Sequence, residues 1–372
     1  MSSLIIRPLG SKKDTIKFIR FLWKIYKNDP NWVPPLMMDR KKFMDRERNP
    51  FYTHADSEFF LAERNGEVVG RIAAIINHNH NKEHRENIGF YGFFESINDQ
   101  EVAVALFNTA RNWLKHRGVT AMRGPVNPSV NDEIGLLIEG FDSPPVIMMT
   151  YNPRYYIELH DSYGLKKVKD LYAYELNQDQ VYSEKFIRVA EMVKKRNSLT
   201  FRSLDMKDFT NEVNRIKKIY NEAWSYNWGA VPMTDAEFDA LAADLRPIVV
   251  PDLVIMAEKD KELIGFALSI PDINIALKYN KSGMLLTGLY HLFTKKKKIN
   301  RARVIVLGVL PEYKKTGAAS VLFYETAVRA RKLGYYYGEA SWILEDNLMM
   351  NRAAETMNAR LYKKYRIYEL PL

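Results

Sequence analysis

A short loop at the end of an apolar run carries residue types that suit a phosphate group. Residues 309–319 read VLPEYKKTGAA and lie between a strand-like run and a helical pattern. Small residues where the helix begins let backbone N–H groups approach a ligand closely, and a helix N-terminus adds unpaired donors and the positive end of a dipole. The residues concerned are Lys314, Lys315, Thr316, Gly317, Ala318 and Ala319. A plain strand-to-helix turn would use the same small residues, so the loop alone leaves both interpretations open.

Two polar side chains alternate on the strand-like run that follows. Glu339 and Ser341 stand two residues apart in YYYGEASWI, so they share one face of a strand. A carboxylate there can take a proton from a reacting group, with the hydroxyl or a water as relay. Glu345 is a second candidate for the same role. The alternatives are a salt-bridged or solvent-facing Glu339 and a helix-capping Glu345.

A polar loop in the first half of the chain is a candidate acceptor site. Residues 124–140 read GPVNPSVNDEIGLLIEG and follow a strand-like run, and loops at the carboxyl ends of strands often bind substrates. Turn chemistry alone would also explain this composition. The candidate substrate-binding residues are Asn127, Ser129, Asn131 and Glu133, with Asn152 and Tyr155 on weaker grounds.

Cysteine and histidine give little support for thiol or metal chemistry. The 372 residues include no cysteine, which excludes a thiolate nucleophile, a disulfide scaffold and cysteine-ligated zinc. His78, His80 and His84 lie close together without a supporting pattern of carboxylates. We therefore expect solvated histidines and no metal site.

The elements that would position these residues occur twice along the chain. Each half has two β-prone runs around a turn, a third strand, an amphipathic helix ended by a glycine, and a further strand. In the first half, Asn98 is the expected helix cap, with Glu101 three residues on. We expect two copies of one α/β unit, as domains 1–180 and 181–372, with the polar stretch 177–184 as the boundary.

Charge and hydropathy limit the partners. There are 55 Lys+Arg against 45 Asp+Glu, which favours anionic partners, but no nucleic-acid-binding motif accompanies the excess. The segment 271–300 contains GMLLTGLYHLF followed by TKKKK, which fits a buried helix with a solvated basic end or an interfacial helix. From these residues we expect neither a secretory signal nor a membrane-spanning run. We expect a cytoplasmic protein, with peripheral contact to an anionic membrane as an option.

The second half resembles the GNAT superfamily of acyl-CoA N-acyltransferases. The resemblance covers residues 200–372 and rests on the order hairpin, strand ending in Val-x-Pro, Lys-x-x-Gly-x-Ala loop, helix, strand and Asn-initiated helix. Lys314 replaces the usual Gln or Arg of the loop. Residues 50–176 look like a second, degenerate copy, because 96–103 has no glycine loop.

The resemblance implies a fold, a cosubstrate and a mechanism. The fold is α/β (α+β), with two GNAT-like domains, each a mixed, mostly antiparallel, splayed sheet flanked by helices. The second copy would bind acyl-CoA. Its strand around residues 307–309 would separate from the next strand, and the pantetheine arm would lie in the V-shaped opening between them. The first copy would shape the acceptor pocket. The implied cofactor-binding residues, besides the loop, are Leu307, Gly308, Val309 and Asn347. No tyrosine stands at the family's proton-donor position, which is occupied by Ala354 or Asn358 depending on the asparagine counted from.

Three segments together are similar to a narrower family. DPNWVPPL from Asp29, the loop from Gly124 and SWILED from Ser341 resemble double-GNAT proteins that include bacterial ceramide synthases. This similarity implies a long-chain amine acceptor acylated directly from acyl-CoA. Alternatives are a polyamine, aminoacyl or protein amine acceptor, a non-catalytic acyl-CoA- or lipid-binding protein, and, on charge alone, a nucleic-acid binder.

Overall fold

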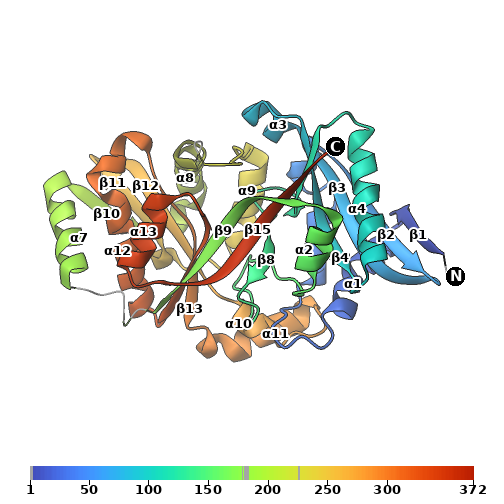
Figure 1. The fold of residues 1–372 in the computed structure, drawn as a ribbon. Coiled ribbons are helices and arrows are strands. Elements are labelled where there is room, and N and C mark those ends of the chain that lie inside the picture. The colour runs from blue at the N-terminus through green and yellow to red at the C-terminus, as the bar shows by residue number, and fades with distance from the viewer. Residues whose placement is uncertain (1–2, 178, 180–183, 225–226) are drawn as a thin grey trace. The chain divides into compact units, whose positions relative to one another are not determined.

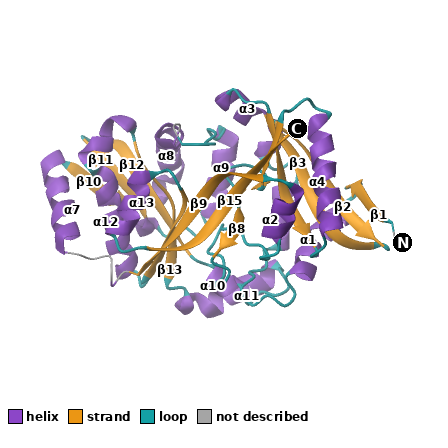
Figure 2. Ribbon diagram, in the orientation of Figure 1, coloured by secondary structure: helices purple, strands orange, loops and turns teal. Residues whose placement is uncertain are grey.

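The computed structural model describes residues 3–177, 179, 184–224 and 227–372, and it divides into two compact units (Figure 1). Unit 1 comprises Met1–Leu171, Ala276–Thr294 and Lys363–Leu372, and unit 2 comprises Tyr172–Ile275 and Lys295–Tyr362. Helices and strands are mixed throughout, which confirms the α/β class (Figure 2). Most of the expected boundary stretch, residues 178 and 180–183, lies outside the described residues.

Unit 1 is built on a mostly antiparallel sheet in the order β1-β2-β3-β4-β5-β15, with β8 also paired to β15. Among the strand pairs that the structure describes in this unit, β4–β5 is parallel and the others are antiparallel. The strands are β1 (Leu4–Pro8), β2 (Ala55–Arg64), β3 (Glu67–Asn77), β4 (Ile88–Ser96), β5 (Ala121–Gly124), β8 (Leu136–Glu139) and β15 (Arg360–Pro371), with β6 (Val126–Asn127) and β7 (Glu133–Ile134) as a separate pair. The helices are α1 (Lys12–Ile25), α2 (Met37–Met44), α3 (His78–His84), α4 (Gln100–Lys115), α5 (Tyr156–Tyr163) and α11 (Leu285–Lys295).

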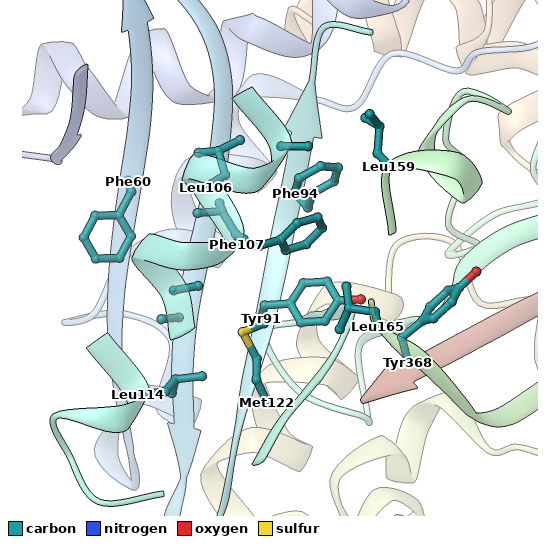
Figure 3. Close-up of a cluster of buried hydrophobic side chains, with 14 of the residues drawn as sticks. Phe60, Tyr91, Phe94, Leu106, Phe107, Leu114, Met122, Leu159, Leu165 and Tyr368 are labelled. Atoms are coloured by element: carbon teal, nitrogen blue, oxygen red, sulfur yellow. The ribbon is translucent and has the colours of Figure 1, made fainter. Parts of the chain in front are cut away.

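The core of unit 1 forms where α4 packs on the sheet. Val102, Leu106 and Ala110 recur at helical spacing and are fully buried. The rings of Phe94, on β4, and Phe107, on α4, are stacked with their centroids 4.6 Å apart (Figure 3). This packing fixes β4, which pairs in parallel with β5, the strand that leads into the polar loop.

The cap of α4 corrects one expectation. Asp99, and not Asn98, is the N-cap, and its carboxylate accepts from the backbone N–H of Glu101 at 2.9 Å. Arg64 donates to the same Asp99 carboxylate at 2.7 Å. Since this ion pair fixes Asp99, the helix begins one residue later than the sequence predicts.

Unit 2 has the sheet order β14-β13-β12-β11-β10, with β9 on the other side of β14. Alternate side chains of β11 enter cores on opposite faces: Val254 and Met256 pack with α8 and α9, whereas Ile255 and Ala257 pack with α12. The strands are β9 (Lys166–Asn177), β10 (Leu199–Ser203), β11 (Val254–Lys259), β12 (Glu262–Pro271), β13 (Arg301–Val309) and β14 (Tyr337–Leu344). The helices are α7 (Glu184–Asn197), α8 (Phe209–Trp224), α9 (Asp235–Leu245), α10 (Asn274–Leu277), α12 (Ala318–Lys332) and α13 (Leu348–Thr356).

The parallel strands β13 and β14 separate part-way along their length. Their pairing begins at Arg301 and ends at Val304, which lies opposite Ala340. On its other edge β13 stays paired with β12 up to Val309, across a register shift next to Ser269 that marks a bulge. Beyond Val304, β13 therefore has one edge without described ladder pairing, as the resemblance implied.

The same arrangement occurs in unit 1. β4 pairs with β5 only over Ile88–Phe90. Phe93, three residues later, has a left-handed backbone (φ 51°). Its N–H donates at 2.6 Å to the side chain of Asn127 instead of continuing the ladder to β3. Both units thus have a bulged central strand that leaves its parallel neighbour.

Candidate active site

A buried polar cluster lies on β13 and β14 of unit 2, and Glu339 is at its centre. The side chain of Glu339 is 1% exposed, and its Oε1 accepts from the Ser341 hydroxyl at 2.6 Å. The Tyr362 hydroxyl donates to Oε2 of the same carboxylate. The Nε of Arg303, the register partner of Glu339, lies 3.8 Å from Oε1 and donates to Ser341 at 3.1 Å.

This cluster joins two predicted catalytic residues to two partners that sequence reasoning missed. Glu339 and Ser341 share a strand face, as their spacing predicts. Arg303 provides the opposite charge that a buried carboxylate requires, and Tyr362 provides a hydroxyl. A lone arginine in the apolar run RVIVLGVL was the available signal for Arg303, because an isolated charge in a buried strand needs a partner.

Glu345 and Asn347 lie beyond the end of β14, in the turn before α13. Asn347 is the N-cap of α13, and its Oδ1 accepts from the N–H of Met350 at 3.2 Å. The carbonyl of Glu345 accepts from the Asn351 side chain at 3.2 Å. Asn347 thus has the local role of a helix cap, and Glu345 is held in the turn through its backbone.

The predicted phosphate loop follows β13 directly. Residues Pro311–Thr316 form a 3-10 turn, and Gly317 is the N-cap of α12 with a left-handed backbone (φ 83°). The Thr316 hydroxyl accepts from the N–H of Ala318 at 3.2 Å. Lys314 and Lys315 are exposed, and Ala319 is partly exposed in the first turn of α12. Gly317 has no side chain to cap α12, and in the described structure Thr316 takes the N–H of Ala318, so the donors left for an anion are those of the next residues of the first turn.

The three strand residues expected beside the cosubstrate lie in the separated part of β13. Val309 is buried against α12, and Leu307 is partly buried in the same cluster. Gly308 contacts α8, since a Cβ added there would lie 2.2 Å from the ring of Trp224. The side chains here serve packing, which leaves backbone groups as the polar atoms of this edge.

In unit 1, two of the candidate acceptor residues come together around a bulged strand. Asn127 donates to Oε2 of Glu133 at 3.1 Å, and Arg40 of α2 donates to Oε1 of Glu133. Burial raises the pKa of Glu133, but the charge and hydrogen bond of Arg40 and the amide of Asn127 outweigh it, so the net pKa lies below its ordinary value. Glu133 is therefore an ionised, partly buried carboxylate.

The other candidates contact backbone and turn atoms. Ser129 donates to Asp132 at 2.5 Å and accepts from the N–H of Asn131 at 3.1 Å, which is a local turn. Asn152 bonds both the N–H and the carbonyl of Leu137, at 2.7 and 3.1 Å. Tyr155 donates to the carbonyl of Ser96 at 2.7 Å. These contacts stabilise the loop conformation itself.

Unit 1 contains a second buried carboxylate, which sequence reasoning missed. Glu95 on β4 accepts from the hydroxyls of Tyr26 and Tyr156 at 3.0 and 2.7 Å. Its register partner Arg71 lies 3.6 Å from the other oxygen. Burial raises the pKa of Glu95 above its ordinary value, although Arg71 and the hydroxyls oppose this. The signal was again a single arginine and a single glutamate within apolar runs.

The histidines form helix α3 and pair with carboxylates. His78 lies 3.0 Å from Asp56 and His80 lies 3.0 Å from Glu86. His80 is 1% exposed and packs on Phe90, so the expectation of solvated histidines is wrong for this residue. In the part of the chain that the structure describes, no group of three His, Cys, Asp or Glu side chains is placed to hold a metal ion.

Comparison with known proteins relates this architecture to a family. A model of the acetyltransferase (GNAT) family matches residues 20–134. The chain is 34% identical to the bacterial ceramide synthase of Caulobacter vibrioides over 381 residues, which covers 100% of this chain and 98% of that protein. The chain belongs to the GNAT acyltransferase family. The matched segment lies in the first copy, whereas the loop motif that suggested the family lies in the second.

Two further comparisons agree with this family. Protein YghO of Escherichia coli is 33% identical over 98% of this chain and 95% of its own length. A tandem GNAT protein from the clavulanic acid biosynthesis pathway is structurally similar, with a TM-score of 0.58 and 11% identity over 99% of this chain and 98% of that one. The GNAT chain described here therefore has a tandem fold, and it is an acyltransferase.

Proposed function

We propose that this protein transfers an acyl group from acyl-CoA to the amine of a long-chain lipid, in the manner of a ceramide synthase. The observation that carries the proposal is the buried Glu339, held between the Ser341 and Tyr362 hydroxyls beside the point where β13 leaves β14. The name of the Caulobacter relative, at 34% identity over the full chain, supports the lipid amine as acceptor.

The residues present fit an acyl-CoA. The edge of β13 beyond Val304, which has no described ladder partner, offers backbone groups to a pantetheine arm. The Gly317 loop with Lys314 and Lys315 offers donors and charge to a pyrophosphate. When bound, the thioester supplies the activated acyl carbon. In this proposal unit 2 binds the thioester.

The polar cluster supplies the proton transfers. The acceptor nitrogen forms a bond to the acyl carbon as the C–S bond breaks, and Glu339 takes the proton that the amine loses, directly or through Ser341. The departing sulfur needs a proton. We assign this proton to Tyr362, whose hydroxyl donates to Glu339, in place of the donor that is missing at Ala354. The products are an amide and a free thiol.

The acceptor side is assigned to the first copy. Asn127 and Glu133 lie at the bulge of β4, and the ionised Glu133 suits an ammonium or hydroxyl group. Domains 1–180 and 181–372 remain the proposed functional division. We place the protein in the cytoplasm, in peripheral contact with an anionic membrane, because a lipid amine is drawn from a bilayer.

A thermal-shift series with coenzyme A and acyl-CoAs of increasing chain length tests the cosubstrate. A ligand at 100 times its Kd stabilises the native state by about 2.7 kcal/mol. We expect stabilisation by thioesters, greatest for long chains. If no thioester stabilises the protein, the proposal is wrong.

A free-thiol assay then tests the acceptor. We expect thiol release with a long-chain amino alcohol and acyl-CoA, and little with a polyamine, an aminoacyl compound or a protein amine. Release with one of these alone would reassign the acceptor. Tight thioester binding without release to any amine would indicate a non-catalytic acyl-CoA-binding protein.

A further inference from the structure

Helix α11 presents an apolar face to solvent. Leu286 is 74% exposed, Leu289 52%, Tyr290 64% and Phe293 86%. Seven of the large apolar side chains that are exposed in the described residues lie between Tyr279 and Phe293; they are Tyr279, Met284, Leu285, Leu286, Leu289, Tyr290 and Phe293. A patch of this kind in one short segment marks an interaction site.

The inward side of α11 is the less apolar one. Gly288 is its only fully buried residue, and the half-buried His291, Leu292 and Lys295 follow at helical spacing. A Cβ added at Gly288 would lie 3.0 Å from Leu36, so the helix packs closely on unit 1 through this small residue. An ordinary surface helix would bury its leucines and phenylalanine. Here the larger apolar side chains point away from the protein.

Unit 1 holds the segment in place through backbone contacts. The Trp23 indole donates to the carbonyl of Lys281 at 2.7 Å, and the N–H of Met37 donates to the carbonyl of Gly283 at 2.9 Å. Asn280 donates to the carbonyl of Met284 at 3.0 Å, at the beginning of the helix. The exposed face therefore belongs to a fixed helix.

Positive charge accompanies the apolar face along the chain. Lys278 and Lys281 precede α11, and Lys295 at its end leads into Lys296–Lys298, while no acidic residue occurs between Asp272 and Glu312. Apolar side chains flanked by lysines suit binding to an anionic lipid surface. The apolar side chains insert at the boundary between headgroups and acyl chains, and the lysines bind the anionic headgroups. A second copy of the same face would bring like charges together.

We propose that α11, from Met284 to Phe293 with the flanking lysines, is the element that docks the protein on anionic bilayers. This role for α11 rests on the proposed function, because a long-chain lipid amine resides in a membrane. The helix would lie in the plane of the interface. No described helix is long and apolar enough to cross a membrane.

Vesicle co-sedimentation with the full chain tests the proposal. We expect binding to vesicles of phosphatidylcholine with about one-third phosphatidylglycerol, weaker binding to pure phosphatidylcholine, and a loss with added salt. The double variant Leu286→Ser/Phe293→Ser should lower binding at least about tenfold. Both residues are exposed, so folding should be retained. The control Ile5→Ser alters a side chain that is 55% exposed on β1 and should bind normally.

The lysines are tested in the same assay. Lys297→Glu/Lys298→Glu should weaken binding to anionic vesicles by about fivefold or more per position. The matched control Lys12→Glu/Lys13→Glu changes two exposed lysines elsewhere and should have a much smaller effect. Absence of binding to anionic vesicles, or equal losses in variant and control, would overturn the proposal. A dimer that Leu286→Ser/Phe293→Ser converts to a monomer would assign the face to a second copy instead.

A last measurement separates docking from catalysis. Thiol release with a long-chain amino alcohol dispersed in detergent, without vesicles, should be unchanged in Leu286→Ser/Phe293→Ser. Normal release without vesicle binding in the wild type would reject docking and keep the transferase. Vesicle binding without release to any amine would keep docking and reject the transferase.

Discussion

Buried carboxylates occur in both units beside an arginine on the neighbouring strand, but their hydroxyl partners differ. Glu339 accepts from a serine two residues away and from Tyr362, whereas Glu95 accepts from two tyrosines on helices or their ends. The Ser341 hydroxyl accepts from Arg303 while it donates to Glu339, so it links the carboxylate and the arginine in one hydrogen-bond network. This difference is why we place the base in unit 2.

Replacing Glu339 by glutamine is expected to lower the rate of thiol release by about 100-fold or more, because a general base contributes roughly that factor. The change also leaves Arg303 without its buried counter-charge, so the melting temperature should fall. Thiol release per folded molecule, measured across pH, separates the two effects. Lost base catalysis should be partly regained at high pH, where the free amine predominates.

Glu345→Gln is the matched control, because Glu345 is the second candidate and lies in the turn after β14. It should retain most of the activity. A large loss in Glu345→Gln together with normal release in Glu339→Gln would transfer the base role to Glu345.

For single residues, the sequence indicates which side chains could do chemistry but not which side chains they contact in the fold. The two-residue spacing predicted that Glu339 and Ser341 share a face. Arg303 precedes Glu339 by 36 residues in the chain, and only the strand register brings it opposite Glu339. Tyr26 and Tyr156 reach Glu95 from elements far apart in the chain, which no local spacing could indicate.

At the scale of elements, local patterns predict most of the fold. Both hairpins form as expected, with left-handed residues Asn65 and Gly66 in the first turn and Asp260 and Lys261 in the second. The separation of β13 from β14 was implied only by resemblance. Its physical cause is a bulge between paired strands, and a bulge depends on the partner's register.

Gly317→Ala tests the loop. We expect a loss of about 1–2 kcal/mol in the free energy of unfolding, because the left-handed backbone disfavours a Cβ and that atom would lie 3.2 Å from Val193. The affinity for acyl-CoA should fall as well. Urea unfolding and thermal shift with acyl-CoA measure the two effects.

Gly66→Ala is the control, since Gly66 has φ 77° but nothing within 4 Å of an added Cβ. In this variant the free energy of unfolding should fall only because the left-handed backbone disfavours a Cβ. Its affinity for acyl-CoA should be normal. Equal acyl-CoA affinity in both variants would contradict the assignment of the loop to the pyrophosphate.

At the scale of the whole molecule, buried histidines make stability depend on pH. Burial lowers the pKa of His160 to about 4 and that of His80 to about 4. An unfolded histidine titrates near 6.5, so the unfolded state binds more protons between about pH 4 and 6.5. The free energy of unfolding should therefore fall as the pH drops through this window.

His160→Phe keeps an aromatic ring between Phe94 and Phe107 and removes the titrating group. The fall in melting temperature from pH 7 to pH 5 should be smaller than in the wild type. His116→Gln, at an exposed helix end, is the control for the loss of a histidine that is not buried. An unaltered slope in His160→Phe would refute the assignment.

The order of segments in unit 1 has a consequence for synthesis of the chain. Strand β15 pairs with β5 and β8, and its Arg366 donates to Asp170 at 2.8 Å, although 196 positions separate these two residues in the chain. Translation of 196 residues takes roughly 10–40 s at a ribosomal rate of about 5–20 residues per second. During that interval the edge of β5 that later pairs with β15 has no partner strand. Such an edge can pair with another chain and so promote aggregation, unless a chaperone covers it.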